Sequence, residues 1–199
     1  MSKINKPVIL PNIRNITISG RIGAGATTLA QKLSEEFHWP LLEGGELFER
    51  IHKELKIDQE DVLERPDKFD LQFEQKIKDI LTKESQQIIQ SHLAGFDIQG
   101  ISGVYKILVI CQDENGEDKA DIRIDRLMNR DGISIEAAKH EALEREKENL
   151  IKFRKLYAHN DPNWIYWDEK YYDLLVNTYS LNREEAFKFV LEKIGYKQQ

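Results

Sequence analysis

The spacing of apolar residues along the chain alternates between the spacing typical of strands and that typical of helices. This pattern predicts strands that alternate with helices. Isoleucines at positions 13, 16 and 18 lead to Gly20, and helical spacing follows from residue 27 to 37. The run 105–111 (YKILVIC) is almost continuously apolar, as a parallel strand covered on both faces requires. Further strands are predicted at 39–42, 87–91 and 172–177. Helices are predicted near 47–55, 69–81, 120–130 and 134–157, with a final helix capped by Asn182.

This order of elements predicts the fold class. Strands that alternate with helices form a parallel α/β sheet with helices on both faces. The chain has 199 residues, of which 40% are hydrophobic, so one domain with one substantial core is expected. The stretch 113–160 is the least core-like part, because its long second helix carries only a thin apolar stripe.

Charge and composition exclude several kinds of partner. The formal net charge is −6, whereas a protein that binds nucleic acid normally has a basic face. No stretch approaches the roughly 18 apolar residues of a membrane span, and no secretory signal is apparent near Met1. Cys111 is the only cysteine, which fits a reducing compartment. We therefore expect a cytoplasmic monomer that binds small phosphate compounds, with neither nucleic acid nor membrane as partner.

A glycine-rich loop after the first strand carries the strongest functional signal. It lies between a strand and a helix, the context that a phosphate-binding P-loop needs. Glycines let backbone N–H groups point inward, where the start of the helix adds positive potential for phosphates. A glycine turn that is merely tight is the alternative. The candidate phosphate-binding residues are Gly20, Arg21, Ile22, Gly23, Ala24, Gly25, Ala26, Thr27 and Thr28.

Three arginines share a predicted helix face. Arg123, Arg126 and Arg130 are spaced i, i+3 and i+7, so their guanidinium groups project together. Three cations on one face repel each other unless an anion joins them, and a triphosphate is such an anion. The alternative is a solvated basic face offset by the aspartates at 121, 125 and 131. Arg145 and Lys152, seven residues apart, share a face of the next helix, for which an exposed helix with paired charges is the alternative.

With these motifs, the chain resembles the archaeal-type cytidylate kinases and their bacterial relatives from about Ile16 to Ile194. The resemblance rests on the loop and on four later segments: 44–48 (GGELF), 123–134 with its three arginines, Arg145-Glu146, and 172–178 (YDLLVNT). It implies a three-layer α/β/α P-loop NTPase fold with a helical lid. It also implies transfer of the γ-phosphoryl group of ATP to CMP or dCMP, which depends on positioning and charge neutralisation.

The resemblance assigns parts of the site to this sequence. The core would comprise 13–44, 84–112 and 171–196, the acceptor-binding helical segment about 45–83, and the lid about 119–157. ATP would lie on the loop with Mg²⁺ on Thr27. Arg123, Arg126, Arg130 and Arg145 would close over the transferred group. Acceptor-binding candidates are Gly45, Phe48, Arg50, Asp70, His92 and Lys152.

Several positions depart from the family pattern, and all of them remove or weaken a positive charge. Ala26 replaces the loop lysine, Glu49 and His92 stand at arginine positions, and Lys152 replaces a further arginine. No acidic residue stands in the strand before His92 to hold Mg²⁺ through water. Three interpretations stay open: substitutes such as Arg21 and Arg50 restore the charge, activity is reduced, or the chain binds nucleotide without catalysis. An acceptor such as AMP, UMP or a small metabolite is a further alternative.

Overall fold

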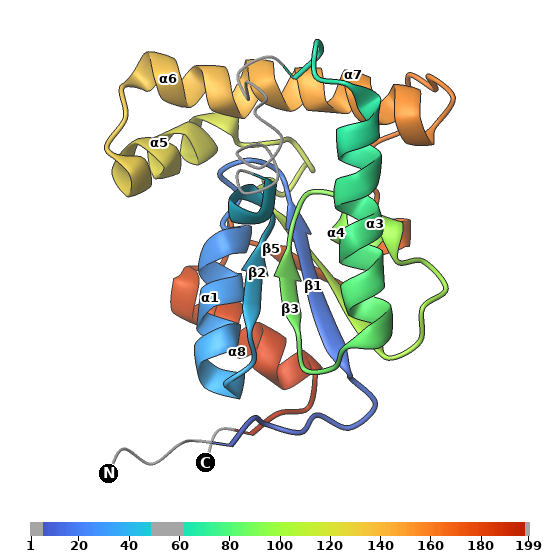
Figure 1. Ribbon diagram of the computed structural model, residues 1–199. Coiled ribbons are helices and arrows are strands. Elements are labelled where there is room, and N and C mark those ends of the chain that lie inside the picture. Colours follow the sequence, from blue (N-terminus) through green and yellow to red (C-terminus); the bar gives the residue numbers. More distant parts are fainter. Residues whose placement is uncertain (1–5, 49–61, 198–199) are drawn as a thin grey trace.

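A parallel sheet forms the centre of the molecule. The computed structural model describes residues 6–48 and 62–197. Within them, the strands lie in the order β2-β3-β1-β4-β5, and every pair is parallel (Figure 1). The strands are β1 (Asn15–Gly20), β2 (Leu41–Glu43), β3 (Ile88–Gln90), β4 (Val104–Ile110) and β5 (Leu174–Asn177). The central strand β1 is buried at every position and confirms the strand predicted to end at Gly20, and β4 confirms the strand predicted at 105–111.

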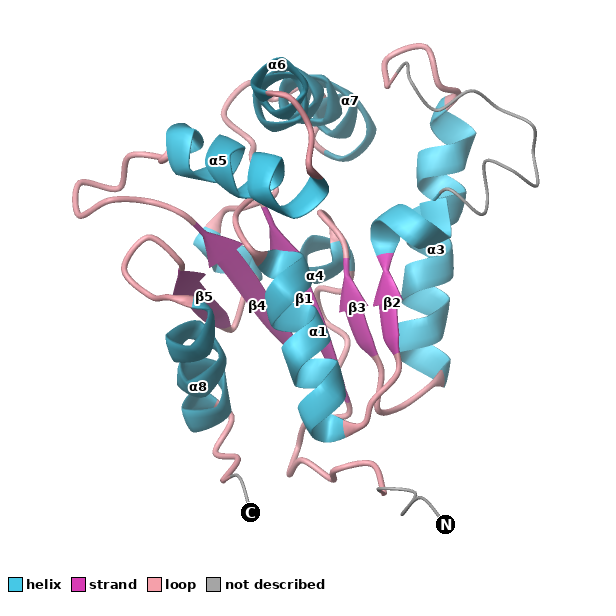
Figure 2. Cartoon of the chain, turned by 90° about the vertical axis from the view of Figure 1, so that its left-hand side faces the viewer, coloured by secondary structure: helices cyan, strands magenta, loops and turns pink. Residues whose placement is uncertain are grey.

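Helices cover both faces of this sheet. On one face lie α1 (Ala26–Phe37) and α8 (Arg183–Lys193), and on the other lie α3 (Asp67–Lys83) and the short α4 (Ala94–Asp97) (Figure 2). Each face has its own apolar cluster. Ile16 and Ile18 belong to the first, and Ile89 and Ile77 belong to the second. The predicted three-layer α/β/α architecture is therefore confirmed.

A helical layer lies above the carboxyl ends of the strands (Figure 1). It contains α5 (Ala120–Asp131), α6 (Ile135–Lys139), a π-helical turn (His140–Arg145) and α7 (Glu146–Tyr157). The last three run on without a break, which agrees with the single helix predicted over 134–157. A small apolar cluster around Ile124, Leu127 and Ala138 joins α5 to α6. This layer coincides with the predicted lid segment, and it faces the end of the sheet where open α/β folds bind ligands.

Local sequence signals explain where several elements begin. The side chain of Asn182 accepts hydrogen bonds from the backbone of Glu184 and Glu185, and Glu185 bonds back to Asn182, so the predicted capping box starts α8. The short 3₁₀ helix Glu169–Tyr171 precedes β5. Cys111, which follows β4, is buried and not part of a disulfide.

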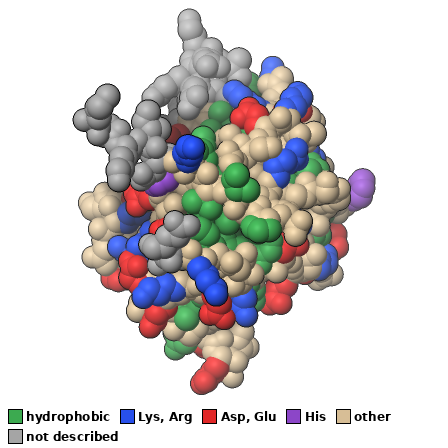
Figure 3. All heavy atoms as spheres, turned by 90° about the horizontal axis from the view of Figure 1, so that it is seen from below, with side chains coloured by type: hydrophobic (Ala, Val, Ile, Leu, Met, Phe, Trp, Pro, Cys, Tyr) green, Lys and Arg blue, Asp and Glu red, His purple; other side chains and the backbone are tan. Residues whose placement is uncertain are grey.

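The face opposite the helical layer, near the chain termini, carries charges of both signs around a patch of apolar atoms (Figure 3). No helix among the described residues is long and apolar enough to cross a membrane.

Candidate active site

The glycine loop leaves β1 and enters α1 in a conformation that only glycines permit. Gly23 has φ +79°, and a Cβ atom there would lie 2.6 Å from the carbonyl oxygen of Arg123. Gly25 has φ +104° and immediately precedes the first residue of α1. The loop and the first turn of α1 therefore direct backbone N–H groups and the positive end of the helix toward one space. Residues 20–29 line this cavity, whose volume is about 520 Å³.

Among the described residues, five arginines line this cavity: Arg21 of the loop itself, and Arg126, Arg130, Arg145 and Arg183 from other elements. Arg126 donates to Thr178 Oγ1 and to the Thr178 carbonyl oxygen, both at 2.8 Å, and to the Ala24 carbonyl oxygen at 3.3 Å. These bonds fix its guanidinium group beside the loop. The cavity therefore combines the backbone anion site with side-chain cations, as a polyphosphate ligand requires.

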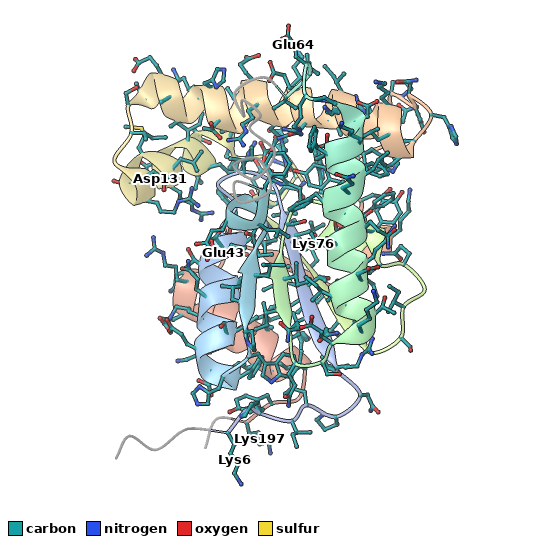
Figure 4. The ribbon with its side chains drawn as sticks, in the orientation of Figure 1. Lys6, Glu43, Glu64, Lys76, Asp131 and Lys197 are labelled. Atoms are coloured by element: carbon teal, nitrogen blue, oxygen red, sulfur yellow. The ribbon has the colours of Figure 1, made fainter. Side chains whose placement is uncertain are left out.

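Two further arginines of the helical layer, Arg130 and Arg145, are held by partly exposed carboxylates. Arg145 pairs with Glu141 at 2.8 Å, and both side chains are more than a third exposed. Arg130 pairs with Asp131, whose hydrogen bond raises the pKa of Arg130, and the charges of Asp131 and Glu43 add to the effect. Figure 4 labels Asp131 on the lid and Glu43 below it, at the end of β2. Exposed pairs of this kind are weak, so a phosphate can replace the carboxylate partner.

Arg123 departs from the expectation that all three arginines of α5 face one anion. Its side chain has no exposed surface, and it does not line the cavity. It pairs with Asp118 at 2.8 Å and with Glu146 at 3.1 Å, and it donates to the carbonyl oxygen of Ile22. Because these partners come from a turn, from α7 and from the loop itself, the helical spacing of the arginines could not reveal them.

Arg21 is held by the same two carboxylates. It pairs with Asp118 at 3.1 Å and bonds to Glu146, and its guanidinium group lies 4.6 Å from the ring centre of Trp167. Burial disfavours its charge, but the hydrogen bond and charge of Glu146 leave the pKa of Arg21 raised. Glu146 also accepts the backbone N–H of Ile22 at 3.1 Å. Nothing in the sequence pattern indicated that Glu146 and Asp118 hold the loop against the helical layer.

A second, smaller cavity adjoins the first. Its volume is about 120 Å³, and the two cavities share Gly45, Gln90, His92 and Arg145 as lining residues. Phe48, Phe73 and Phe153 line it as well, and the rings of Phe48 and Phe73 meet edge to face at 5.5 Å. The predicted residues Gly45, Phe48, Asp70 and His92 thus come together here, whereas Arg50 lies outside the described residues. The aromatic lining suits a flat ring, and the shared residues lead toward the loop.

A buried ion pair forms one wall of the second cavity. Arg65 donates to Asp70 Oδ1 at 2.6 Å and to Asp70 Oδ2 at 3.3 Å, and it lies over the ring of Phe48. Both side chains of the pair are 4% exposed. Arg65 was missed in the sequence, where nothing sets it apart from other charged residues beside a proline.

Lys152 also departs from its expected place. It lines neither cavity, and its side chain is almost fully buried. Its Nζ donates to the carbonyl oxygens of Val62 and Arg65 and lies 3.3 Å from Asp70 Oδ2. In this structure Lys152 therefore joins α7 to the wall of the second cavity, and it does not extend toward the loop.

His92 lies where the two cavities meet. Its Nδ1 is 3.1 Å from the carbonyl oxygen of Gly20, so in the neutral ring Nδ1 carries the proton and donates it. Burial lowers the pKa of His92 despite the opposing effect of that bond, so the ring is neutral near pH 7. His92 thus supplies no charge of its own at neutral pH, and Arg145 is the arginine that reaches both cavities.

Together, the strand–loop–helix anion site, the second cavity and the overlying layer with its arginines define a P-loop kinase. Solved structures share this fold. A protein from Eubacterium ventriosum, described as uncharacterized, matches with a TM-score of 0.64 and 18% identity over 92% of this chain and 99% of that one. A shikimate kinase from Bacteroides thetaiotaomicron matches with a TM-score of 0.58 and 16% identity over 92% of this chain and 98% of that one.

The sequence gives a narrower assignment. The model of the cytidylate kinase-like family matches residues 15–180, and the chain belongs to this family. It is 28% identical to a cytidylate kinase of Methanosarcina acetivorans over 86% of this chain and 91% of that protein. It is 29% identical to a cytidylate kinase of Ignicoccus hospitalis over 88% and 95%. These findings confirm the predicted resemblance and the predicted ATP-dependent phosphotransferase, which is a nucleoside monophosphate kinase.

Proposed function

We propose that this enzyme transfers the γ-phosphoryl group of ATP to CMP or dCMP. The observation that carries the proposal is the meeting of two unlike cavities at His92 and Arg145, one built around a phosphate loop and the other lined by aromatic rings. A donor triphosphate in the first and a nucleoside monophosphate in the second would bring both phosphates to the shared residues. Positioning of this kind supplies much of the catalysis in phosphoryl transfer.

The wall of the second cavity suits a cytosine ring. Cytosine presents an amino group beside two acceptor atoms, N3 and O2. Carboxylates accept from the cytosine amino group, and guanidinium groups donate to ring acceptors. Asp70 and Arg65 supply this combination next to Phe48. In this proposal both residues contact the base, and Lys152 keeps Asp70 in place.

Lid residues neutralise charge on the transferred group in the proposed reaction. Arg126, Arg130 and Arg145 line the loop cavity, so they are proposed to contact phosphate oxygens directly. Arg123 is proposed to act as a positioning residue, because Asp118 and Glu146 already occupy its guanidinium group. The segments 45–83 and 119–157 are proposed as the acceptor-binding segment and the lid, whose closure would exclude water.

The loop also offers a place for the metal of the donor nucleotide. Thr27 is the second residue of α1 and lines the cavity. Its hydroxyl group is the type of ligand that Mg²⁺ takes in P-loop enzymes. We propose that Thr27 holds Mg²⁺, which supplies charge neutralisation on the phosphates when bound. We also propose that the enzyme is a monomer and works in the cytoplasm, where ATP is available.

The test is the release of ADP from ATP and Mg²⁺ with CMP, dCMP, UMP and AMP, each supplied alone. The proposal expects release with CMP or dCMP well above a blank without acceptor. Release with UMP or AMP alone would replace the proposed acceptor by another nucleotide. Protein that binds ATP and CMP but releases no ADP with any acceptor would contradict the proposal and indicate a nucleotide-binding relative without catalysis.

A further inference from the structure

Two carboxyl groups on one face of α3 line the acceptor cavity. Asp70 and Glu74 are four residues apart, both are buried, and both contribute to the cavity lining. A charged carboxylate is costly to bury unless donors or cations compensate it. The two carboxyl groups differ in the groups that surround and compensate them.

Asp70 is compensated by cations. Its Oδ2 lies 3.3 Å from both Arg65 Nε and Lys152 Nζ, and its Oδ1 accepts a hydrogen bond from Arg65 Nη2 at 2.6 Å. Most of its capacity to accept hydrogen bonds is therefore already used.

Glu74 has a carboxyl group as its partner. Among the described residues its side-chain hydrogen bond is to Asp97 of α4, and neither Glu74 Oε2 nor Asp97 Oδ2 accepts a bond from an N–H or hydroxyl donor. Glu74 is 6% exposed and Asp97 is 8% exposed. Two carboxyl groups in such a contact share one proton, because both cannot be ionised there.

The directions of the two pKa shifts favour a proton on Glu74. Burial raises the pKa of Glu74 well above its ordinary value, and the charges of Asp97 and Asp70 raise it further. Burial also raises the pKa of Asp97, but the bond from Glu74 works in the opposite direction and favours the ionised form of Asp97. The remaining groups that face the pair are Lys78 of α3, 3.9 Å from Asp97, and the hydroxyl group of Tyr157 of α7.

In this arrangement Glu74 can offer a ligand only a hydrogen-bond acceptor. Its O–H group is committed to Asp97, so its other carboxyl oxygen can only accept a hydrogen bond. An acceptor at the wall of the cavity attracts an amino group of a ligand and repels a carbonyl oxygen. Cytosine and uracil differ in this respect at one position, since cytosine carries an amino group where uracil carries a carbonyl oxygen.

We propose that Glu74 is a specificity-determining residue of the acceptor site, whose free carboxyl oxygen accepts a hydrogen bond from the amino group of cytosine, and that Asp97 fixes the orientation of this carboxyl group. The inference rests on the proposed function, because it takes a pyrimidine nucleotide as the occupant of the second cavity. With Glu74, the site should discriminate between CMP and UMP more strongly than Asp70 and Arg65 would alone.

The experiment compares two acceptors in three proteins. The acceptors are CMP and the ribonucleoside monophosphate of 2-pyrimidinone, which lacks only the amino group. The proteins are the natural one, Glu74→Gln and Glu74→Leu. In the natural protein, kcat/KM should favour CMP by about 10- to 100-fold, as expected when a buried acceptor is left without its donor. Glu74→Gln should keep this ratio, because its amide can donate to Asp97 and present the carbonyl oxygen. Glu74→Leu should lower this ratio clearly, toward the weaker discrimination that Asp70 and Arg65 provide alone.

A ratio of CMP to the analogue that is the same in Glu74→Leu as in the natural protein would overturn the proposal. So would a natural protein that does not distinguish the two acceptors, a result that does not depend on any variant folding. Lys76→Leu, an exposed change on the same helix, is the control for adding an apolar side chain to α3. If no acceptor yields ADP, the proposed function fails separately, and calorimetric binding of CMP and the analogue to the same proteins still decides the role of Glu74.

Discussion

Replacing Glu146 by glutamine should destabilise the fold strongly, because this carboxylate joins the phosphate loop to the lid. Glu146 is 5% exposed and accepts bonds from Arg21, Arg123 and the backbone N–H of Ile22. Breaking a buried ion pair costs about 3–5 kcal/mol when one charge is left alone. Here Asp118 remains as a partner of both arginines. We therefore expect a loss near the lower limit, about 3 kcal/mol.

Unfolding in urea measures this loss directly, and thermal unfolding gives an independent check. A loss of about 3 kcal/mol corresponds to a Tm lower by roughly 6–12 °C in a chain of this size. Glu141→Gln is the matched control, since Glu141 forms an exposed pair with Arg145 on the preceding turn, and its loss should cost about 0.5 kcal/mol or less. Equal stability of the two variants would refute the inference that Glu146 holds the loop against the lid.

Three further predictions follow from the site. Arg126→Ala should lower turnover far more than it weakens ATP binding, since Arg126 lies beside the loop and is proposed to act on the transferred group; steady-state kinetics with a separate ATP-binding measurement checks this, and unchanged turnover would contradict it. Lys152→Met should raise KM for the acceptor while KM for ATP stays the same, because Lys152 fixes Asp70 and the wall of the second cavity; equal changes in both KM values would count against that role. The raised pKa of Glu74, caused first by burial and then by Asp97, makes the free energy of unfolding decrease as pH rises above its ordinary value of 4.5 toward the higher folded-state value, because the folded chain holds a proton that the unfolded chain releases. Glu74→Gln should reduce this slope in unfolding experiments at pH values from 4.5 upward, and an unchanged slope would assign it to other groups.

The sequence predicted those features that depend on short stretches of chain. Closely spaced isoleucines and an almost continuous apolar run identified β1 and β4, because a strand buried on both faces needs little beyond its own residues. The glycine loop was predicted for a similar reason. The positive φ angles of Gly23 and Gly25 are a backbone requirement that the residue type itself reveals. The cap of α8 likewise needs only Asn182 and Glu185.

Tertiary contacts decided which charged side chains face the ligand cavities. Helical spacing put Arg123 and Arg126 on one face of α5, but Asp118 and Glu146 hold Arg123 in the interior while Arg126 lines the cavity. Lys152 was similarly directed to the wall around Asp70 by carbonyl groups of Val62 and Arg65. A buried charge lies where its compensating partners are, and these partners come from other elements.

The sequence by itself thus determined the class of fold and the glycine loop, since both follow from local pattern and order along the chain, and its motifs identified the family by resemblance. Only the tertiary structure decided that Glu146 holds the loop from 124 residues away, that Arg65 pairs with Asp70 beside an aromatic cavity, and that the buried carboxyl groups of Glu74 and Asp97 meet in a hydrogen bond. The physical reason is that the charge state and direction of a buried polar group depend on the distances to its neighbours, and folding sets those distances.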